Sequence, residues 1–362
     1  MQKKSILFIA DKPDWAYHNI IKTWSESLQN DFDCYVAFST DFEINIKKFT
    51  NHERLFFNTA NKLLKKDLFF KIDSSKNFSC PIYQNPPVYK VLNLKKVNKI
   101  HFDISIEMAY YFQYTAHLPF NSDKKLIGIY TDSFPHEGPS YDHKKEIELK
   151  NLNREEFHEQ YLKKYDGIIV GNTNLYSDYN HFTDKIIFAN GIYKQNEFLE
   201  NNNIGENETL TIGWTGNPNR PMKGFKEVII PAIEEVEKTG RKIKLKTQFS
   251  GSYDSILSFY KDVDLVVIAS EADTGPSLFS DACLSDVPSV STKIGFPKMV
   301  IQHEKNGLFV NRDIDEVKNA IIKLYDDRIL LKKFSKTIKQ DYLKLLDNQI
   351  SINNLKNYIN TL

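Results

Sequence analysis

Short apolar runs rich in β-branched residues alternate along this chain with stretches that have the periodicity of amphipathic helices, and this alternation limits the possible folds most. Brief, unbroken apolar runs of this kind are typical of buried strands. Strands are expected at residues 6–10, 33–38, 102–107, 126–130, 167–170 and 185–188 in the first half, and at 209–214, 242–249 and 265–269 in the second. Strands that alternate with helices favour a parallel, doubly wound sheet. The expected fold class is therefore α/β.

The chain is long enough for two such sheets. Its 362 residues suit two domains of about 150 to 200 residues, each with a buried core. A polar segment rich in Asn and Glu, 195–208, separates the two sets of strands and is the best candidate for a linker. We expect a Rossmann-like domain over residues 1–190, a second over 191–338, and a C-terminal helix over 339–362.

Composition excludes several classes of function. The net charge of +1 gives no reason to expect a nucleic-acid partner. The three cysteines, Cys34, Cys80 and Cys283, are widely spaced, and His101, His117 and His303 lack the spacing of metal ligands. We therefore expect neither a disulfide framework nor a metal site. No apolar run reaches the roughly 20 residues of a membrane span, so we expect a cytoplasmic protein.

One loop of the second half has the features of an anion-binding site. The strand at 265–269 is followed by acidic residues, a glycine-containing turn and a helical pattern over 278–284. Gly275 frees the backbone, and Pro276 suits a first helical position. The start of a helix presents unpaired N–H groups that attract phosphate or sugar oxygens. Ligands of open α/β sheets bind at this edge of the sheet.

Two charged side chains accompany that loop, and each has two interpretations. Lys223 follows the loop 215–222 and begins a helical pattern over 223–238, where its ammonium can meet a phosphate. Alternatively, it is a solvated lysine at a helix end. Asp281 either accepts hydrogen bonds from sugar hydroxyls or only stabilises the dipole of its helix.

Segments of the second half, in the right order, resemble the retaining glycosyltransferases of the GT-B fold, in particular those like glycosyltransferase family 4, also called group 1. Asp273 and Asp281 have the spacing of that family's two glutamates. The other matching segments are Asp286-Val-Pro-Ser-Val290, Asn306-Gly-Leu-Phe-Val310, Asn190-Gly191-Ile192, and Gly216-Asn217 followed by Lys223-Gly224. The chain departs from the family where Asn217 replaces an arginine, where both acids are Asp, and where one glycine, Gly295, replaces two.

The resemblance implies a GT-B fold whose last helix crosses back to the first domain, and a nucleoside diphosphate-sugar donor bound without a metal or other cofactor. It implies that Lys223, with Arg220 in place of the missing arginine, holds the diphosphate beside Gly216 and Asn217. Asp281 would bind the ribose, and Asp273 or its competitor Glu271 would contact the donor sugar. Thr274, Gly275, Pro276 and Ser277 would complete the donor site.

In the first half, the resemblance directs attention to residues that follow strands. Asp132 and His136 come after the strand at 126–130, where many family members have an Asp or His close to the donor sugar, and we assign them with Asp273 to catalysis. Asp14, Trp15 and His18 follow the first strand and are candidates for binding a glycan, lipid-linked or small-molecule acceptor. An aromatic residue at a helix start is otherwise a packing residue.

The segment 44–101 carries twelve basic and three acidic residues together with aromatic ones. Such a segment can hold a protein at an anionic membrane surface or form a solvated face. The function expected is glycosyl transfer in cell-surface polysaccharide or glycoconjugate synthesis. Two alternatives stay open: a nucleotide-sugar epimerase or hydrolase on the same fold, and a non-catalytic binding subunit.

Overall fold

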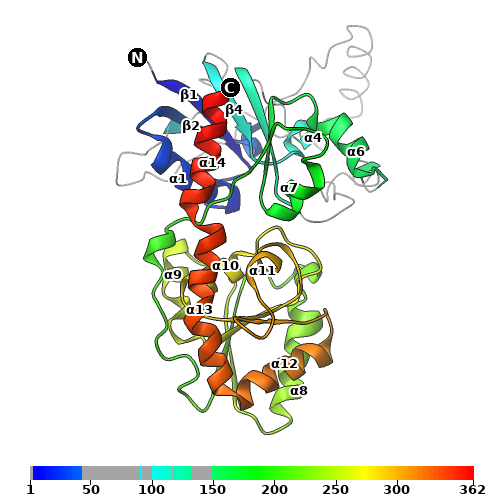
Figure 1. Cartoon of the computed structure of the whole chain (residues 1–362), viewed down its shortest axis with the longest axis vertical. Helices are drawn as coiled ribbons and strands as arrows, with labels where there is room; N and C mark the ends of the chain where they lie inside the picture. Colours follow the sequence, from blue (N-terminus) through cyan, green and yellow to red (C-terminus); the bar gives the residue numbers. More distant parts are fainter. Residues whose placement is uncertain are drawn as a thin grey trace, which may run out of the picture.

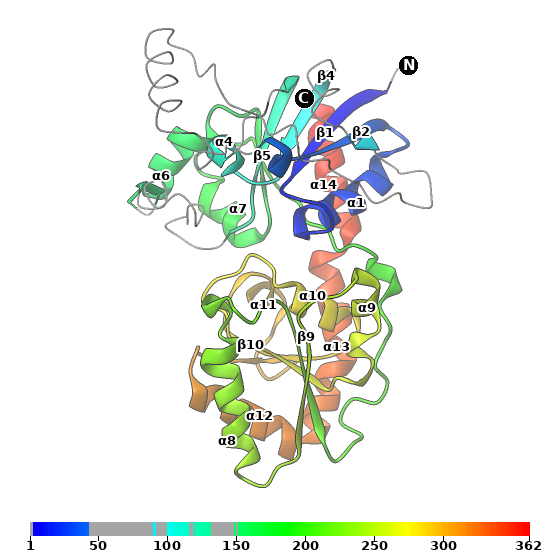
Figure 2. The same cartoon turned by 180° about the vertical axis from the view of Figure 1, so that it is seen from behind.

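A computed structural model of the chain describes residues 3–42, 90–91, 100–115, 118, 120–131, 148–149 and 151–362. These residues form two α/β units that lie one above the other (Figures 1 and 2). Most of the segment 44–101, and with it the predicted membrane contact, lies outside the described residues. Among the described residues, no helix is both long enough and apolar enough to cross a membrane.

The N-terminal unit contains a parallel sheet with the order β3-β2-β1-β4-β5-β6-β7 among the described residues. Its strands are β1 Lys4–Ala10, β2 Phe32–Phe38, β3 Lys90–Val91, β4 His101–Glu107, β5 Asn121–Ile129, β6 Gly167–Val170 and β7 Ile186–Phe188. Its helices are α1 Ala16–Leu28, α4 Phe112–Thr115, α6 Arg154–Phe157 and α7 Thr173–Tyr179, with shorter turns at Ser39–Phe42 and His158–Leu162. A further short turn, Gln195–Glu197, follows the first crossing between the units. The order reverses direction at β1 and β4, which is the doubly wound arrangement expected.

The C-terminal unit contains a second parallel sheet, with the order β12-β11-β10-β8-β9. Its strands are β8 Leu210–Thr215, β9 Ile243–Gln248, β10 Leu265–Ile268, β11 Ser289–Ser291 and β12 Leu308–Phe309. Its helices are α8 Ile230–Glu237, α9 Tyr253–Leu257, α10 Ser277–Leu284, α11 Gly295–Val300, α12 Ile314–Asp326 and α13 Arg328–Leu346, with shorter turns at Pro221–Lys223, Phe225–Ile229 and Phe259–Asp262. The predicted α/β class and the two-sheet plan are confirmed.

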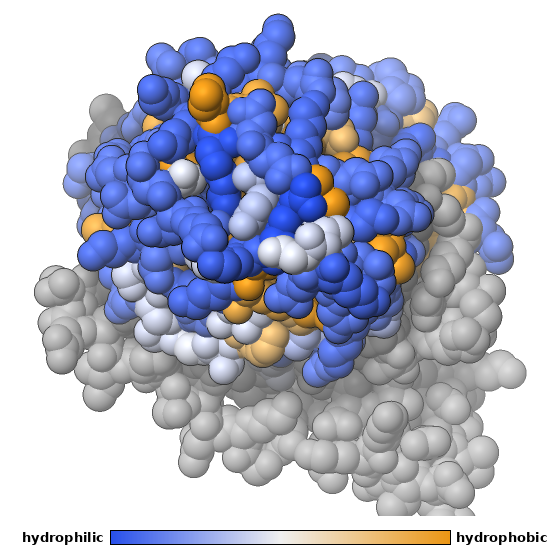
Figure 3. Space-filling view, turned by 90° about the horizontal axis from the view of Figure 1, so that it is seen from below, coloured by the Kyte–Doolittle hydropathy of each residue, from blue (hydrophilic) through white to orange (hydrophobic). Residues whose placement is uncertain are grey.

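Each sheet has its own core because its central strands are apolar on both faces. All four residues of β10 are buried, as are Ile6 to Ala10 of β1. Strands buried on both faces are typical of parallel sheets covered by helices on each side. The end of the molecule seen in Figure 3 presents mostly hydrophilic side chains, with hydrophobic ones scattered among them.

The C-terminal helices join the two units. α13 packs on the C-terminal unit through buried residues such as Phe334 and Ile338, and the chain then bends at Asp347. α14, Asn348–Thr361, crosses to the N-terminal unit and packs against α1 and β7 (Figure 1). The predicted crossing helix is therefore confirmed. The helical pattern over 329–362 is two helices, and position 339 lies inside α13.

The chain first crosses between the units at Asn190–Tyr193, where α14 holds it. Asn348 donates its amide to the Ile192 carbonyl and accepts from the Ile192 N–H, at 2.8 Å each. The indole N–H of Trp24 donates to the Asn190 carbonyl at 2.9 Å. The predicted linker 195–208 comes after this crossing and packs on the C-terminal unit, where Phe198 and Ile204 are buried.

Candidate active site

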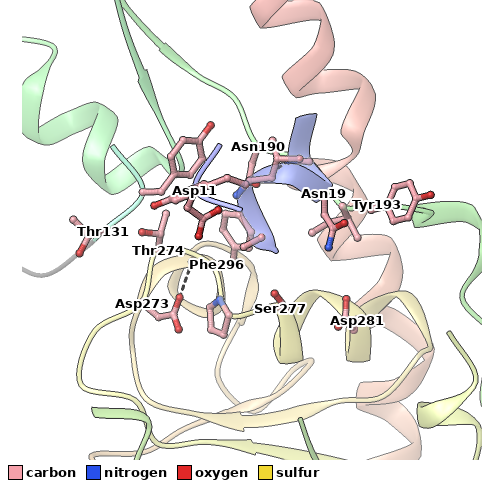
Figure 4. Close-up of a pocket in the computed structure, with 18 of the residues that line it drawn as sticks. Asp11, Asn19, Thr131, Asn190, Tyr193, Asp273, Thr274, Ser277, Asp281 and Phe296 are labelled. Carbon is pink, nitrogen blue, oxygen red and sulfur yellow. Dashed lines mark hydrogen bonds between the residues drawn. The ribbon is translucent and has the colours of Figure 1, made fainter. Parts of the chain in front are cut away.

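A cavity of about 440 Å³ lies where the two units face each other (Figure 4). It is bounded by loops that follow β1, β5 and β7 of the N-terminal unit and β8 and β10 of the C-terminal unit. The carboxyl ends of parallel strands meet at this edge in both sheets, so side chains from distant parts of the sequence gather there.

The loop that carries Lys223 differs from the predicted helical start. Gly224 has φ +69, and the helical segment expected over 223–238 begins directly after it, as the turn Phe225–Ile229 that runs on into α8 at Ile230. A Cβ at Gly224 would lie 2.4 Å from the carbonyl oxygen of Ala269, so this position requires glycine. The close approach brings the Lys223 loop against the end of β10.

Arg312, which the sequence analysis did not single out, fixes this loop further. Its guanidinium donates to the Ala269 carbonyl at 3.0 Å and to the Pro221 carbonyl at 2.7 Å. It also pairs with Glu271 at 3.5 Å. Glu271 is thus paired with Arg312. Its side chain is 63% exposed and does not line the cavity. A lone arginine after β12 gave no sequence signal because its three partners are far away in the chain.

Lys223 and Asp273 form an ion pair at the floor of the cavity. Their side chains are largely buried, and both line the cavity. Asp273 also accepts a hydrogen bond from the Gly275 N–H through its other oxygen, at 3.2 Å (Figure 4). The carboxylate therefore links the cation to the loop that starts α10.

Two glycines shape the turn before α10. A Cβ at Gly275 would lie 2.3 Å from the ring of Phe296, and a Cβ at Gly295 would lie 2.2 Å from the Asp273 carbonyl. The turn can therefore pack on α11 only without side chains at these positions. α10 begins at Ser277, and within the described ranges no side chain caps it. Exposed Ser277 lies at the cavity (Figure 4), so the start of the helix, where N–H groups are unpaired, borders the cavity.

Asp281 lies one turn into α10 and also lines the cavity, beside Tyr253. The residue is only 4% exposed. Burial raises the pKa of the Asp281 carboxyl well above its usual range, because a charge is poorly solvated there. A residue that serves only the helix dipole would sit at the surface, so burial favours the interpretation that Asp281 binds a ligand.

Thr274 connects the site to the N-terminal unit. Its carbonyl accepts a hydrogen bond at 2.9 Å from the amide of Asn172, which is fully buried and also caps α7. Within the part of the chain that the structure describes, the Thr274 hydroxyl is buried and has no partner. Gly216, Asn217 and Arg220 are exposed; with Lys223 they line an adjoining pocket of about 210 Å³ that Pro276 and Ser277 also reach.

The residues predicted to contact an acceptor do not line the cavity. His18 is fully buried, where it packs on Phe38 and accepts a hydrogen bond from the Asp14 N–H at 2.9 Å. Asp14 pairs with Lys22, and the Trp15 ring lies under the Lys12 ammonium. Asp132 and His136 lie outside the described residues. The N-terminal wall is formed instead by Asp11, Ala16, Tyr17, Asn19, Ile20, Tyr111, Tyr130, Thr131, Asn190 and Gly191.

Comparisons with known proteins agree with this arrangement. Residues 231–341 match the family of glycosyl transferases group 1. No curated protein matches the chain in sequence. Among similar solved structures, a sucrose-phosphate synthase from Thermosynechococcus elongatus has 9% identity and a TM-score of 0.67 over 99% of each chain. HepE from Anabaena, in complex with UDP and glucose, has 10% identity and a TM-score of 0.63 over 99% of this chain and 100% of HepE. A TarM mutant from S. aureus, in complex with fondaparinux, alpha-GlcNAc-glycerol and UDP, has 14% identity and a TM-score of 0.61 over 99% of this chain and 100% of TarM.

The two Rossmann-like sheets around one cleft, together with the matched segment, define a glycosyltransferase of the GT-B fold. The match to group 1 glycosyl transferases covers residues 231–341, which lie in the C-terminal unit. The expected resemblance to group 1 glycosyltransferases and the expected GT-B fold are thereby confirmed.

Proposed function

We propose that the protein transfers a sugar from a nucleoside diphosphate-sugar to a hydroxyl group of a glycan or lipid-linked acceptor, with retention and without a metal ion. The observation that carries this proposal is the juxtaposition of Lys223 with the uncapped start of α10 in a cavity between the two units. A cation and helix N–H groups together stabilise the negative charge of a departing diphosphate. Arg220, at the mouth of the same cavity, supplies a second cation.

In the proposed reaction, the bond between the anomeric carbon and the diphosphate oxygen breaks, and a bond to the acceptor oxygen forms. The proton of the acceptor hydroxyl leaves with the diphosphate. The diphosphate occupies the space around Lys223 and Ser277, and the ribose hydroxyls donate to Asp281. Asp273, which is bonded to Gly275 and Lys223, faces the sugar. Asp132 and His136 retain their predicted catalytic roles.

The choice of donor is narrowed by similar proteins. HepE and TarM have the same fold and were solved with UDP, so UDP and UDP-sugars are the first compounds to test. The basic segment 44–101 is proposed to bring the protein to the inner face of a membrane, where a lipid-linked acceptor of polysaccharide or glycoconjugate synthesis would lie.

The test is a panel of nucleotide sugars, first by thermal shift and then by release of nucleoside diphosphate. A ligand at about 100 times its Kd raises stability by about 2.7 kcal/mol, which a thermal shift resolves. Lys223→Ala should abolish most turnover, whereas Lys318→Ala, which removes a lysine from the surface of α12, should not. Equal turnover of both variants would refute the role of Lys223.

Two further outcomes separate the alternatives. Turnover that stops with EDTA and returns with magnesium or manganese would refute metal independence. Binding of a nucleotide sugar without any turnover would indicate the non-catalytic subunit, whereas a changed nucleotide sugar without transfer would indicate the epimerase or hydrolase.

A further inference from the structure

Asp11 directly follows β1 and lines the cavity from the N-terminal unit, across from Asp273 and Thr274 (Figure 4). Its Oδ1 is buried and has no hydrogen-bond partner among the described residues. Burial raises the pKa of this carboxyl, although the N–H of Lys12 opposes that rise. Buried polar atoms in folded proteins almost always have partners, because an unpaired one is costly. An unpaired oxygen that borders a cavity therefore marks a position where a ligand donates a hydrogen bond.

The wall beside Asp11 is aromatic. Tyr17, Tyr111 and Tyr130 all line this side of the cavity, and the ring centroids of Tyr17 and Tyr130 are 5.7 Å apart. The Tyr130 hydroxyl already donates to the Ala189 carbonyl at 2.9 Å, so this residue offers its ring to a ligand. Aromatic faces pack on the apolar C–H face of a sugar ring, and a carboxylate accepts from its hydroxyls.

Charge is divided between the two sides of the cavity. Lys223 and Arg220 lie on the C-terminal side, whereas the nearest cation to Asp11 in sequence, Lys12, is directed to the ring of Trp15 at 3.3 Å. An anionic group is therefore favoured beside Lys223 and disfavoured beside Asp11.

We infer that Asp11 and the tyrosine wall form the acceptor subsite, and that the unit bound there is a neutral sugar or polyol whose hydroxyls donate to the Asp11 carboxylate. The word acceptor rests on the proposed function, whereas binding of a neutral sugar or polyol beside Asp11 can be measured without any transfer. The subsite shares the segment after β1 with the predicted Asp14, Trp15 and His18, but it uses Asp11 and Tyr17 of that segment instead.

The experiment measures binding of neutral probes by saturation-transfer-difference NMR. The probes are the methyl glycosides of glucose, galactose and N-acetylglucosamine, with glycerol and ribitol, each with and without UDP; glucose 6-phosphate is the anionic probe. The variants are Asp11→Asn, Asp11→Glu and, as a matched control, Asp33→Asn, which changes an exposed carboxylate of β2. We expect a neutral probe to bind wild type and Asp33→Asn, and to bind Asp11→Asn at least 10-fold more weakly. Asp11→Glu, which pushes the carboxylate into the cavity, should weaken binding too.

Thermal unfolding separates a binding role from a structural one. Because Asp11 carries an unpaired buried oxygen, Asp11→Asn should unfold at the same temperature as wild type or higher, and UDP affinity should stay within two-fold. Unchanged probe binding by both Asp11 variants, or binding of glucose 6-phosphate in preference to every neutral probe, would overturn the inference. Failure of every neutral probe to bind the wild-type protein would also overturn the inference. A failure of UDP to bind would instead count against the proposed function, since the probes are also scored without it.

Discussion

The ion pair between Lys223 and Asp273 leads to a prediction of unexpected sign. Asp273 holds the ammonium that a donor diphosphate would need. Replacing Asp273 by Asn removes a negative charge next to the proposed phosphate position and releases Lys223. A bare nucleoside diphosphate should therefore bind Asp273→Asn more tightly than wild type, although turnover should fall because the proposed contact to the reacting sugar is weakened.

The size of the effect follows from the burial of the pair. Its side chains are 23% and 14% exposed, so the pair lies between exposed ion pairs, worth about 0.2–1 kcal/mol, and hydrogen bonds to charged groups, worth about 1.5–3 kcal/mol. A gain of about 1–2 kcal/mol corresponds to binding that is roughly 5 to 30 times tighter. Because the Asn oxygen still accepts weakly from Lys223, the lower half of this range is expected.

Isothermal titration of UDP into wild type and Asp273→Asn measures the change, with kcat from the turnover assay. The matched control is Asp326→Asn, which removes an exposed carboxylate that pairs with Arg241 at the end of α12. Its affinity for UDP should equal that of wild type. Weaker or unchanged binding of UDP by Asp273→Asn would show that Asp273 does not compete for the Lys223 charge.

Three further predictions concern other parts of the structure. Asp281→Asn should weaken UDP binding by titration, because an amide nitrogen replaces one of the two carboxyl oxygens that can accept from the ribose hydroxyls. Affinity equal to wild type would leave Asp281 without that role. Gly275→Ala should lower the free energy of unfolding in urea by about 1–3 kcal/mol, because its Cβ would overlap the Phe296 ring. Phe296→Leu added to Gly275→Ala should restore part of this loss. A double variant whose loss equals the sum of the two single losses would contradict the steric explanation. Burial raises the pKa of Glu107 from 4.5 to about 7, so the folded state favours the protonated acid. The contribution of this group to the free energy of unfolding is therefore greatest below pH 4.5 and falls by at most about 3 kcal/mol as the pH rises through 7. Urea unfolding of Glu107→Gln at several pH values should lack this slope.

Much of the fold could be predicted because its signals are local. The strands are short apolar runs, and α10 was expected at 278–284 and is found at Ser277–Leu284. The position of Lys223 and Asp281 beside one cavity follows from the rule that ligands bind at the carboxyl ends of parallel strands. These residues are close in sequence to the strands that place them.

The remainder of the site depends on contacts between distant segments. The helix expected from residue 223 begins only after Gly224, against which the carbonyl of Ala269 lies. Arg312 acts on residues 91 and 43 positions away. His18 was a candidate for acceptor binding, yet the phase of α1 turns it into the core, where burial lowers its pKa to about 4. Asp11 became a candidate only when its unpaired oxygen was seen in the cavity. The burial of a single polar residue such as His18, or an unpaired oxygen such as that of Asp11, is not visible in the residue pattern.

The most direct test of the account is an experimental structure of the protein in complex with UDP. The account predicts that the diphosphate lies between the Lys223 ammonium and the first N–H groups of α10, with the ribose hydroxyls against Asp281. A nucleotide bound outside the cleft, or one whose phosphates point away from Lys223 and α10, would contradict it.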